Sequence, residues 1–503
     1  MSRAQGMSLG RRALALGAAK SVDYAIQFLL PVVLVRTLDP ESFGHYRLLW
    51  LVVGTVLMLA SFAMPQSLNY FLPRSNANER RLYVNQTILF MAFMGLAAGI
   101  VIWIIDRLLP QGLGGLGAQG LVVPAFIALW VAATLLDTLP TVDENVAWQT
   151  KSTIGLSVLR AVVLSISAIL TGELGDLLFV LLAFSCFKLM LLVHYVARQH
   201  GLGRPFLARE SLWNQFRHAA PFAISGVLFG LRQRADQWVV ATLFSAAELA
   251  SFSIGIVLTP MVVVFRQSVN HVFLPSMSRL HAEHSTREML ALNSRANIMV
   301  ASPTYPLLAF CFVFAEPLIA VVYTPAYLDA VPVMRTYIVA LLVFVVELQS
   351  VMLLLREGAF QARLNVLNLC VSVALSLSGA LAWGLPGAAL GSVAASYVDR
   401  IAVLVRISRI TGVPVGRLQD WGQLAGVLAA AFCSTLIAHE VIVRAMLLRH
   451  PLAVLCAAAA LIVMIYPVAL VLAGQKRLLA GAMQVFGLRR AAALLIARRT
   501  GEV

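Results

Sequence analysis

The chain has 503 residues, of which 60% are hydrophobic and 12% are charged, whereas about a quarter of the residues in ordinary soluble proteins are charged. This composition predicts an all-α protein that crosses a membrane many times, and it excludes a soluble domain built around one core. The formal net charge is +15. Most basic residues lie in the links between apolar segments, which is the pattern of membrane topology and not of a nucleic-acid groove.

Apolar runs of about 20 residues, each long enough to cross a bilayer, predict about fourteen transmembrane helices. The boundaries are least distinct within 362–410 and 423–473. In chain order the runs cover 13–37, 46–72, 82–105, 119–139, 152–171, 175–197, 219–244, 249–275, 296–323, 331–354, 362–384, 387–410, 423–444 and 451–473.

The first predicted helix carries polar residues that recur on one face. Lys20, Asp23 and Gln27 follow the spacing i, i+3, i+7, which places all three on the same side of a helix. Two interpretations are open: a pair of Lys20 with Asp23 buried against a neighbouring helix, or a stripe that faces a polar cavity. On the second, Lys20 and Gln27 are candidate substrate contacts and Asp23 is a candidate group for ion coupling.

The seventh predicted helix, 219–244, contains Arg232, Arg234 and Asp236 near its midpoint, where each charge costs about 2.5 to 3.5 kcal/mol on insertion scales. In one continuous helix, Arg232 and Asp236 would share a face and Arg234 would lie about 200° round. A structural pair of Arg232 with Asp236 is the alternative. The cluster predicts the wall of a polar cavity, with the arginines as substrate contacts and Asp236 as a group for ion coupling.

Further polar residues fall within later predicted helices. Arg266 and Asn270 share a face of the eighth helix and are candidate substrate contacts, although packing explains the asparagine equally well. Glu347 and Asp399 are candidate groups for ion coupling, and ion pairs between helices explain them equally well. Snorkelling or a local pair is favoured for Lys188 in the sixth helix.

The distribution of basic residues predicts the orientation of the chain in the membrane. If the N-terminus is cytoplasmic, most basic residues of the links lie on the cytoplasmic side, as the positive-inside rule requires. An even number of crossings then places both termini in the cytoplasm. The links on the opposite side and the span ends beside them contain only Arg36, Arg47, Arg107, Arg444 and Arg449.

The chain also repeats itself. QSLNYFLPR at 66–74 ends the second predicted helix, and QSVNHVFLPS at 267–276 ends the eighth. Because six crossings separate the two copies, they have the same orientation, which predicts a parallel repeat of two six-helix lobes with a site at their interface. The predicted domains are an N-terminal lobe, a C-terminal lobe, two additional transmembrane helices and a basic cytoplasmic tail lying on anionic lipid. They cover 1–200, 201–412, 413–474 and 475–503.

The RTLDPESFGHYRL link after the first helix, the QSLNYFLPR end of the second and the two added C-terminal helices resemble bacterial polysaccharide flippases of the multidrug, oligosaccharidyl-lipid and polysaccharide exporter superfamily. The resemblance implies movement of undecaprenyl-pyrophosphate-linked oligosaccharide from the cytoplasmic to the outer leaflet, for O-antigen, capsule or exopolysaccharide. It also implies alternating access through a basic central cavity, a bacterial inner-membrane location, a monomer, and work beside a polysaccharide polymerase and a chain-length regulator.

Two other functions are weighed against the flippase. A cation-coupled multidrug antiporter of the same superfamily favours an acidic cavity, whereas the charges within these spans are mostly basic. A polytopic polysaccharide polymerase or ligase usually needs a long outside loop, and the links here are short. No catalytic constellation appears, and the five cysteines lie in apolar runs without ligand spacing. We therefore expect no enzyme activity, no metal, no cofactor and no nucleic-acid partner.

Overall fold

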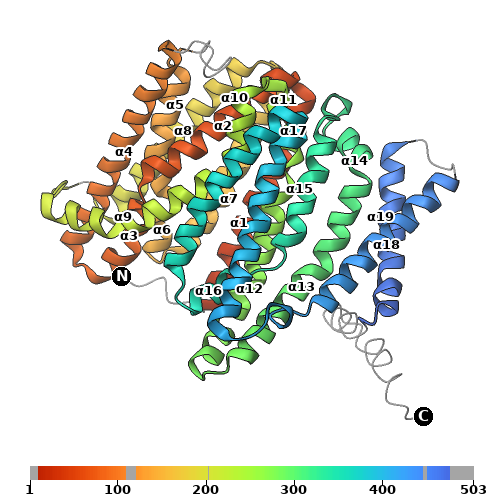
Figure 1. The fold of residues 1–503 in the computed structure, drawn as a ribbon. Coiled ribbons are helices and arrows are strands. Elements are labelled where there is room, and N and C mark those ends of the chain that lie inside the picture. The colour runs from red at the N-terminus through yellow and green to blue at the C-terminus, as the bar shows by residue number, and fades with distance from the viewer. Residues whose placement is uncertain (1–8, 109–119, 202, 446–449, 476–503) are drawn as a thin grey trace. The chain divides into compact units, whose positions relative to one another are not determined.

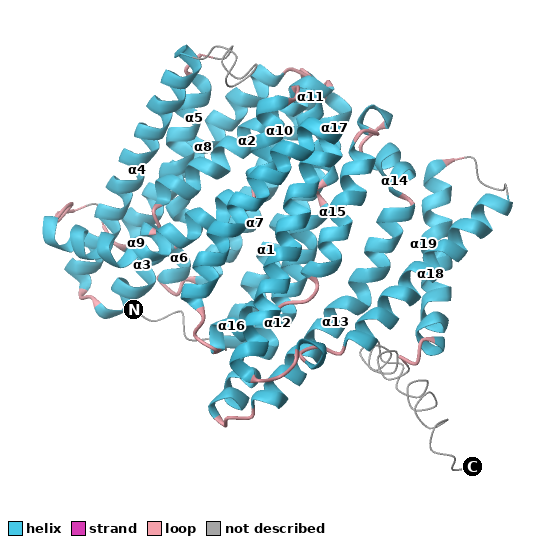
Figure 2. Ribbon diagram, in the orientation of Figure 1, coloured by secondary structure: helices cyan, strands magenta, loops and turns pink. Residues whose placement is uncertain are grey.

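The computed structural model describes residues 9–108, 120–201, 203–445 and 450–475. Every regular element within these ranges is a helix, and no strand occurs among them (Figure 2). The prediction of an all-α fold is therefore confirmed. The predicted basic tail lies, beyond Gln475, outside the described residues.

Contacts divide the chain into two compact units, Met1–Ala250 and Ser251–Val503. Helix α11, Ala246–Gly255, contains the boundary (Figure 1). The first unit holds α1 (Leu9–Thr37), α2 (Pro40–Ser61), α3 (Met64–Phe71), α4 (Ala77–Leu108), α5 (Val122–Ala133), α6 (Leu139–Val142), α7 (Val146–Leu170), α8 (Leu174–Gln199), α9 (Arg209–Arg232) and α10 (Ala235–Leu243). The second holds α12 (Leu258–Ala282), α13 (Thr286–Val313), α14 (Ala315–Val322), α15 (Ala330–Phe344), α16 (Gln349–Leu354), α17 (Gly358–Thr411), α18 (Trp421–Ala445) and α19 (Pro451–Leu472).

Eleven helical segments within the described ranges are long and apolar enough to cross a membrane. They account for the predicted spans with three differences. The 54-residue α17 covers two predicted helices, 362–384 and 387–410, while 219–244 and 331–354 are absent from the eleven. The structure divides 219–244 between α9 and α10, and 331–354 between α15 and α16.

Several predicted spans are interrupted. Phe62 and Ala63, both with left-handed backbone angles, separate α2 from α3. Within α17, Trp383 and Gly384 have non-helical angles, and Gly384 has a φ of 64° that favours glycine. Because a broken helix exposes backbone polar groups, such breaks in a membrane protein occur where protein or a water-filled cavity surrounds them.

Helix α9 packs on α2 and α3 in the first unit. The amide of Gln86 in α4 donates to Oε1 of Gln215 in α9 at 2.7 Å, and Nε2 of Gln215 donates to the hydroxyls of Ser67 and Thr87 at 2.8 and 2.9 Å. Both glutamine side chains are fully buried. The two units are thus defined by packing. The two predicted lobes, which meet between residues 200 and 201, are defined by the sequence repeat and stay a prediction.

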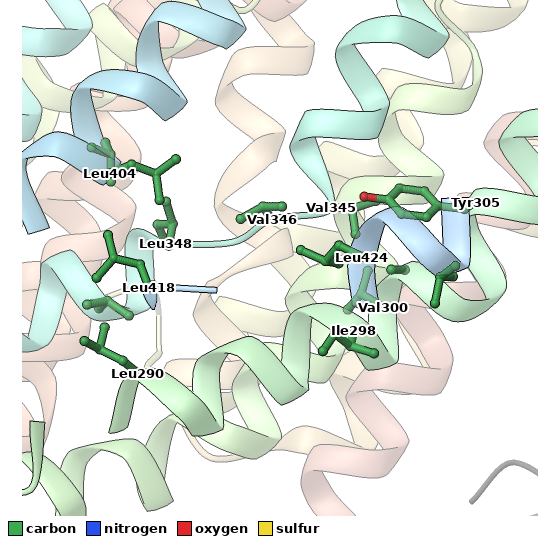
Figure 3. Close-up of a cluster of buried hydrophobic side chains, with 14 of the residues drawn as sticks. Leu290, Ile298, Val300, Tyr305, Val345, Val346, Leu348, Leu404, Leu418 and Leu424 are labelled. Carbon is green, nitrogen blue, oxygen red and sulfur yellow. The ribbon is translucent and has the colours of Figure 1, made fainter. Parts of the chain in front are cut away.

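The core of the second unit lies where α13, α17 and α18 surround the break between α15 and α16. Figure 3 shows Val346 and Leu348, from that break, among side chains of the surrounding helices. Since lipid tails are as apolar as leucine, this packing stabilises the unit through close contact more than through removal from water. The labelled residues of the core are Leu290, Ile298, Val300, Tyr305, Val345, Val346, Leu348, Leu404, Leu418 and Leu424.

Candidate functional site

A cavity of about 970 Å³ lies within the first unit, between α1, α2, α7, α8 and the residues that follow α5. Its charged lining comprises four basic and two acidic side chains. Hydroxyl and amide groups from Gln27, Thr134, Gln149, Thr153 and Ser157 also line it. The six charged residues are Lys20, Asp23, Arg47, Asp137, Arg160 and Lys188.

The polar stripe of α1 faces this cavity, because Lys20, Asp23 and Gln27 all line it. Nε2 of Gln27 donates to Oδ2 of Asp23 at 2.7 Å. From α7, the Ser157 hydroxyl donates to Oδ1 of the same carboxylate, and Nη2 of Arg160 lies 3.8 Å from it. The described partners of Asp23 are thus Gln27 and two residues of α7, which packs along α1, and they do not include Lys20.

A second ion pair lines the cavity. Nζ of Lys188 in α8 donates to Oδ2 of Asp137 at 2.7 Å and lies 4.8 Å from the ring centroid of Trp130. Only 6% of the lysine side chain is exposed, so the ammonium is buried in a pair and does not snorkel to the membrane surface. Sequence reasoning missed Asp137 because it lies at the end of a predicted span, 51 residues from its partner.

Aromatic rings form part of the cavity wall. Trp50 and Trp130 meet edge to face with their centroids 5.2 Å apart. The guanidinium carbon of Arg160 lies 5.6 Å from the Trp50 ring centroid, and Tyr46 and Phe184 complete the aromatic lining. Flat apolar faces beside hydroxyl, amide and cationic groups match a ligand that has both apolar and polar faces.

The predicted continuous helix over 219–244 is wrong. Helix α9 ends at Arg232, Arg234 has a non-helical backbone, and α10 begins at Ala235. The predicted angular relation of the three charges therefore does not apply. Because the helix is broken, Arg232, Arg234 and Asp236 each have different neighbours. A straight helix in an apolar environment would not provide polar neighbours for all three charges.

The three residues at this break lie outside the 970 Å³ cavity. The Arg232 guanidinium carbon is 5.6 Å from the Phe229 ring centroid. Arg234 lies against Gly54 of α2, where an added Cβ would come within 2.7 Å of its Nη2. Oδ1 of the buried Asp236 accepts a hydrogen bond from the backbone N–H of Gln237 at 2.8 Å.

Arg266 and Asn270 lie buried on α12 in the second unit. Nη1 of Arg266 donates to the backbone carbonyl of Phe344 at 2.9 Å. Phe344 is the last residue of α15, so the arginine satisfies a carbonyl that the helix end leaves without an intrahelical donor. Within the described part of the chain, the side-chain amide of Asn270 makes no hydrogen bond.

Glu347 and Asp399 also belong to the second unit. Glu347 lies in the break between α15 and α16, where Oε1 accepts a hydrogen bond from the Ser350 N–H at 3.1 Å and its backbone carbonyl accepts one from Asn297 at 3.2 Å. Oδ1 of Asp399 accepts a hydrogen bond from Nδ2 of Asn368 at 2.9 Å. Both residues are buried; one oxygen of each carboxylate accepts a hydrogen bond, while Oε2 of Glu347 has no partner among the described residues.

The predicted site residues are thus distributed over both units. Lys20, Asp23 and Gln27 share one cavity, which also holds charged residues that sequence reasoning did not select. Arg160 and Lys188 could have been selected, because they fall within predicted spans. Among the residues that the structure describes, no group of three or more His, Cys, Asp or Glu is placed to hold a metal ion.

Solved structures of membrane transporters share this fold. Lipid II flippase MurJ in an inward closed conformation matches with a TM-score of 0.71 at 12% identity, covering 90% of this chain and 97% of that one. An inward-facing MATE family transporter of the MOP superfamily matches with a TM-score of 0.57 at 14% identity, covering 79% and 99%. MATE in complex with MaL6 matches with a TM-score of 0.52 at 15% identity, covering 80% and 97%. These structural matches show that the chain shares its fold with these transporters.

The sequence also matches the model of a family described as polysaccharide biosynthesis protein over residues 33–332. Because this match spans more than half of the chain, the chain belongs to the polysaccharide biosynthesis protein family. No curated protein matches this sequence. The resemblance drawn from the first link, the end of the second helix and the C-terminal helices is confirmed.

Proposed function

We propose that this protein flips undecaprenyl-pyrophosphate-linked oligosaccharide from the cytoplasmic to the outer leaflet of a bacterial inner membrane, for assembly of O-antigen, capsule or exopolysaccharide. The observation that carries the proposal is the cavity of the first unit, with four basic and two acidic side chains beside tryptophan rings. The family assignment supports a role in polysaccharide biosynthesis. The shared fold with a lipid II flippase supports movement of a lipid substrate.

The charge balance of the cavity suits an anionic substrate. Asp23 interacts with Arg160, and Asp137 pairs with Lys188. With four basic and two acidic side chains, the lining still has an excess of positive charge. A pyrophosphate that leaves water needs fixed donors and cations in its place, and such charge-assisted hydrogen bonds are about twice as strong as neutral ones. The tryptophan faces, hydroxyls and amides supply surfaces for sugar rings.

The remaining predicted roles stay part of the proposal. Arg232, Arg234, Arg266 and Asn270 are proposed to bind substrate during alternating access, and Asp23, Asp236, Glu347 and Asp399 to couple transport to an ion gradient. The protein is further proposed to act as a monomer beside a polysaccharide polymerase and a chain-length regulator. A multidrug antiporter, the second candidate, is favoured by the fold shared with MATE transporters.

The proposed function is tested in cells that lack the gene. We expect lipid-linked oligosaccharide to accumulate on the cytoplasmic leaflet of the deletion strain and wild-type protein to clear it. Lys20→Ala combined with Arg47→Ala should lower clearance about tenfold or more at normal protein abundance, since each lost charge-assisted hydrogen bond is worth about 1.5 to 3 kcal/mol.

Lys151→Ala is the matched control for Lys20→Ala, because Lys151 is exposed on α7 and does not line the cavity. If the double variant cleared lipid-linked oligosaccharide as the wild type does, the cavity would not be the substrate site. Efflux of a cationic dye by the reconstituted protein, without accumulation of lipid-linked oligosaccharide in the deletion strain, would favour the antiporter.

A further inference from the structure

A second hollow, of about 550 Å³, lies in the first unit between the broken helix α2–α3 and α9. We call it the α3–α9 groove. Ala63, one of the two residues with left-handed angles at the break, lines it, and so does Met58 one turn before the break. The groove shares only Asn69 with the larger cavity. Its floor on α9 is made of small residues, Ala219, Ala223 and Gly226.

One end of the groove is cationic. Arg74 places its guanidinium carbon 4.0 Å from the centroid of the Tyr70 ring, and the His218 ring stacks on the same tyrosine at 4.3 Å. Nη1 of Arg74 donates to the Tyr70 backbone carbonyl at 2.8 Å. Since Arg74 is exposed and uses one nitrogen in that bond, its remaining donors are available to an anion at the mouth of the groove.

The other end of the groove is apolar. Phe222 and Gly226 follow His218 along one face of α9, and Val227 and Met58 of α2 also line this end. Phe222 is 64% exposed, although it lies in a chain that spans a membrane. A large apolar side chain exposed at such a position contacts lipid, so the wall beyond the cationic end is suited to a hydrocarbon chain.

The groove is long enough to hold part of an acyl chain. His218 and Gly226 are eight positions apart on α9, or about 12 Å at 1.5 Å per residue. In the proposed orientation, Arg74 lies beside a cytoplasmic link. The cationic end then lies at the cytoplasmic interface, where the headgroups of cytoplasmic-leaflet lipids lie, and the apolar end extends away from it along α9.

From this geometry we infer that the α3–α9 groove binds an anionic phospholipid of the cytoplasmic leaflet, with its phosphate between Arg74 and His218 and one acyl chain along Phe222, Gly226 and Met58. A single arginine and an imidazole suit one phosphodiester charge. A groove of this length holds part of one acyl chain, whereas the polyprenyl chain of the proposed substrate is far longer. This site therefore goes beyond the proposed transport function and stands independently of it.

The test uses the full-length protein reconstituted in vesicles of equal phosphatidylglycerol and phosphatidylcholine, then extracted and examined by native mass spectrometry. We expect wild-type protein to retain phosphatidylglycerol in preference to phosphatidylcholine. Arg74→Gln should lower the retained phosphatidylglycerol about tenfold, because it removes a charge-assisted hydrogen bond. Gly226→Leu should do the same by filling the groove, since a Cβ at Gly226 meets no atom within 4 Å.

Two variants serve as matched controls. Arg217→Gln removes a neighbouring exposed arginine of α9 that does not line the groove. Gly155→Leu adds the same bulk at another helical glycine with open space around it, outside the groove. Both should retain phosphatidylglycerol as the wild type does.

Two results would overturn the inference. Equal retention of both lipids by wild-type protein would show that the groove does not select an anionic headgroup. Displacement of phosphatidylglycerol by polyprenyl pyrophosphate would make the occupant the transport substrate. Because the Arg74 side chain is exposed, we expect Arg74→Gln to fold. This variant therefore tests the site even if Gly226→Leu fails to fold. Normal lipid retention in a variant that has lost transport would separate this site from the proposed function.

Discussion

Asp39 begins the second membrane helix. Its carboxylate accepts hydrogen bonds from the backbone N–H groups of Ser42 and Glu41 at 3.0 and 3.1 Å, and Pro40 occupies the first helical position. These are the N–H groups that the start of a helix leaves unpaired. The hydrogen bond from Ser42 is the main cause that lowers the pKa of the Asp39 carboxyl group below its ordinary value.

The lowered pKa gives a prediction for stability against pH. Because the folded-state pKa lies below the unfolded value of about 3.9, the carboxylate stabilises the fold above that pH, and this stabilisation is lost as the pH falls through the folded-state pKa. Asp39→Ala should lower the free energy of unfolding by about 1 kcal/mol near neutral pH, and the difference should shrink as the pH falls below the unfolded value and through the folded-state pKa.

Thermal unfolding of the purified protein across this pH range measures the effect. Asp39→Asn is the control, since its amide oxygen still caps the helix without a titrating group. A difference between Asp39→Ala and the wild type that is constant with pH would contradict the assignment.

At the level of single residues, the sequence predicts those members of the cavity that share one helix. Lys20, Asp23 and Gln27 were selected by periodicity, and all three line the cavity. The pair of Asp137 with Lys188 could not be predicted, because its members are 51 residues apart and no local pattern joins them. The same limit applies to Ser157, whose bond to Asp23 joins residues 134 positions apart.

Helix α17 is the element in which two predicted spans join. Its two halves meet so closely beside the break at Trp383 and Gly384 that an added Cβ at Gly379 or Gly387 would collide with the backbone of the other glycine. Small residues of this kind let membrane helices approach at backbone distance. The close approach of the two halves therefore depends on these glycines.

We expect Gly387→Leu to lower the unfolding temperature and the yield of monodisperse protein, because backbone atoms cannot yield to the new side chain as a flexible side chain would. Fluorescence-detected size-exclusion chromatography after heating measures both quantities. Gly358→Leu, at the open start of the same helix, should behave as the wild type. Equal stability of the two variants would show that the approach at Gly387 is not required.

The sequence predicts where helices lie better than where they break. Gly384 and Pro386 signal the break that divides 362–384 from 387–410. The break at Phe62 and Ala63 has only Pro65, two positions on at the start of α3, as a signal, and both residues are ordinary helix residues held in left-handed angles by their surroundings. The break at Gln233 and Arg234 likewise contains neither glycine nor proline, and it depends on packing that no local pattern records.

At the scale of the whole molecule, the basic residues of the links give a testable topology. Both termini are proposed to be cytoplasmic because an even number of spans returns the chain to its starting side. Green fluorescent protein fused after Val503 should fluoresce, and alkaline phosphatase fused at the same position should be inactive. The reverse pattern would contradict an even number of spans with a cytoplasmic N-terminus. A fusion in the link after Arg107 should give active phosphatase, which controls for the reporter.

The hydrogen bonds that hold α9 in the first unit bear on how the protein is made. Gln86 and Gln215 are 129 residues apart, and at about 5 to 20 residues per second the ribosome needs on the order of ten seconds to deliver the second amide after the first. During this interval the buried amide of Gln86 lacks the partner that it has in the finished protein. The nascent chain therefore passes through a stage at which an insertase or a neighbouring helix has to shelter an amide from lipid.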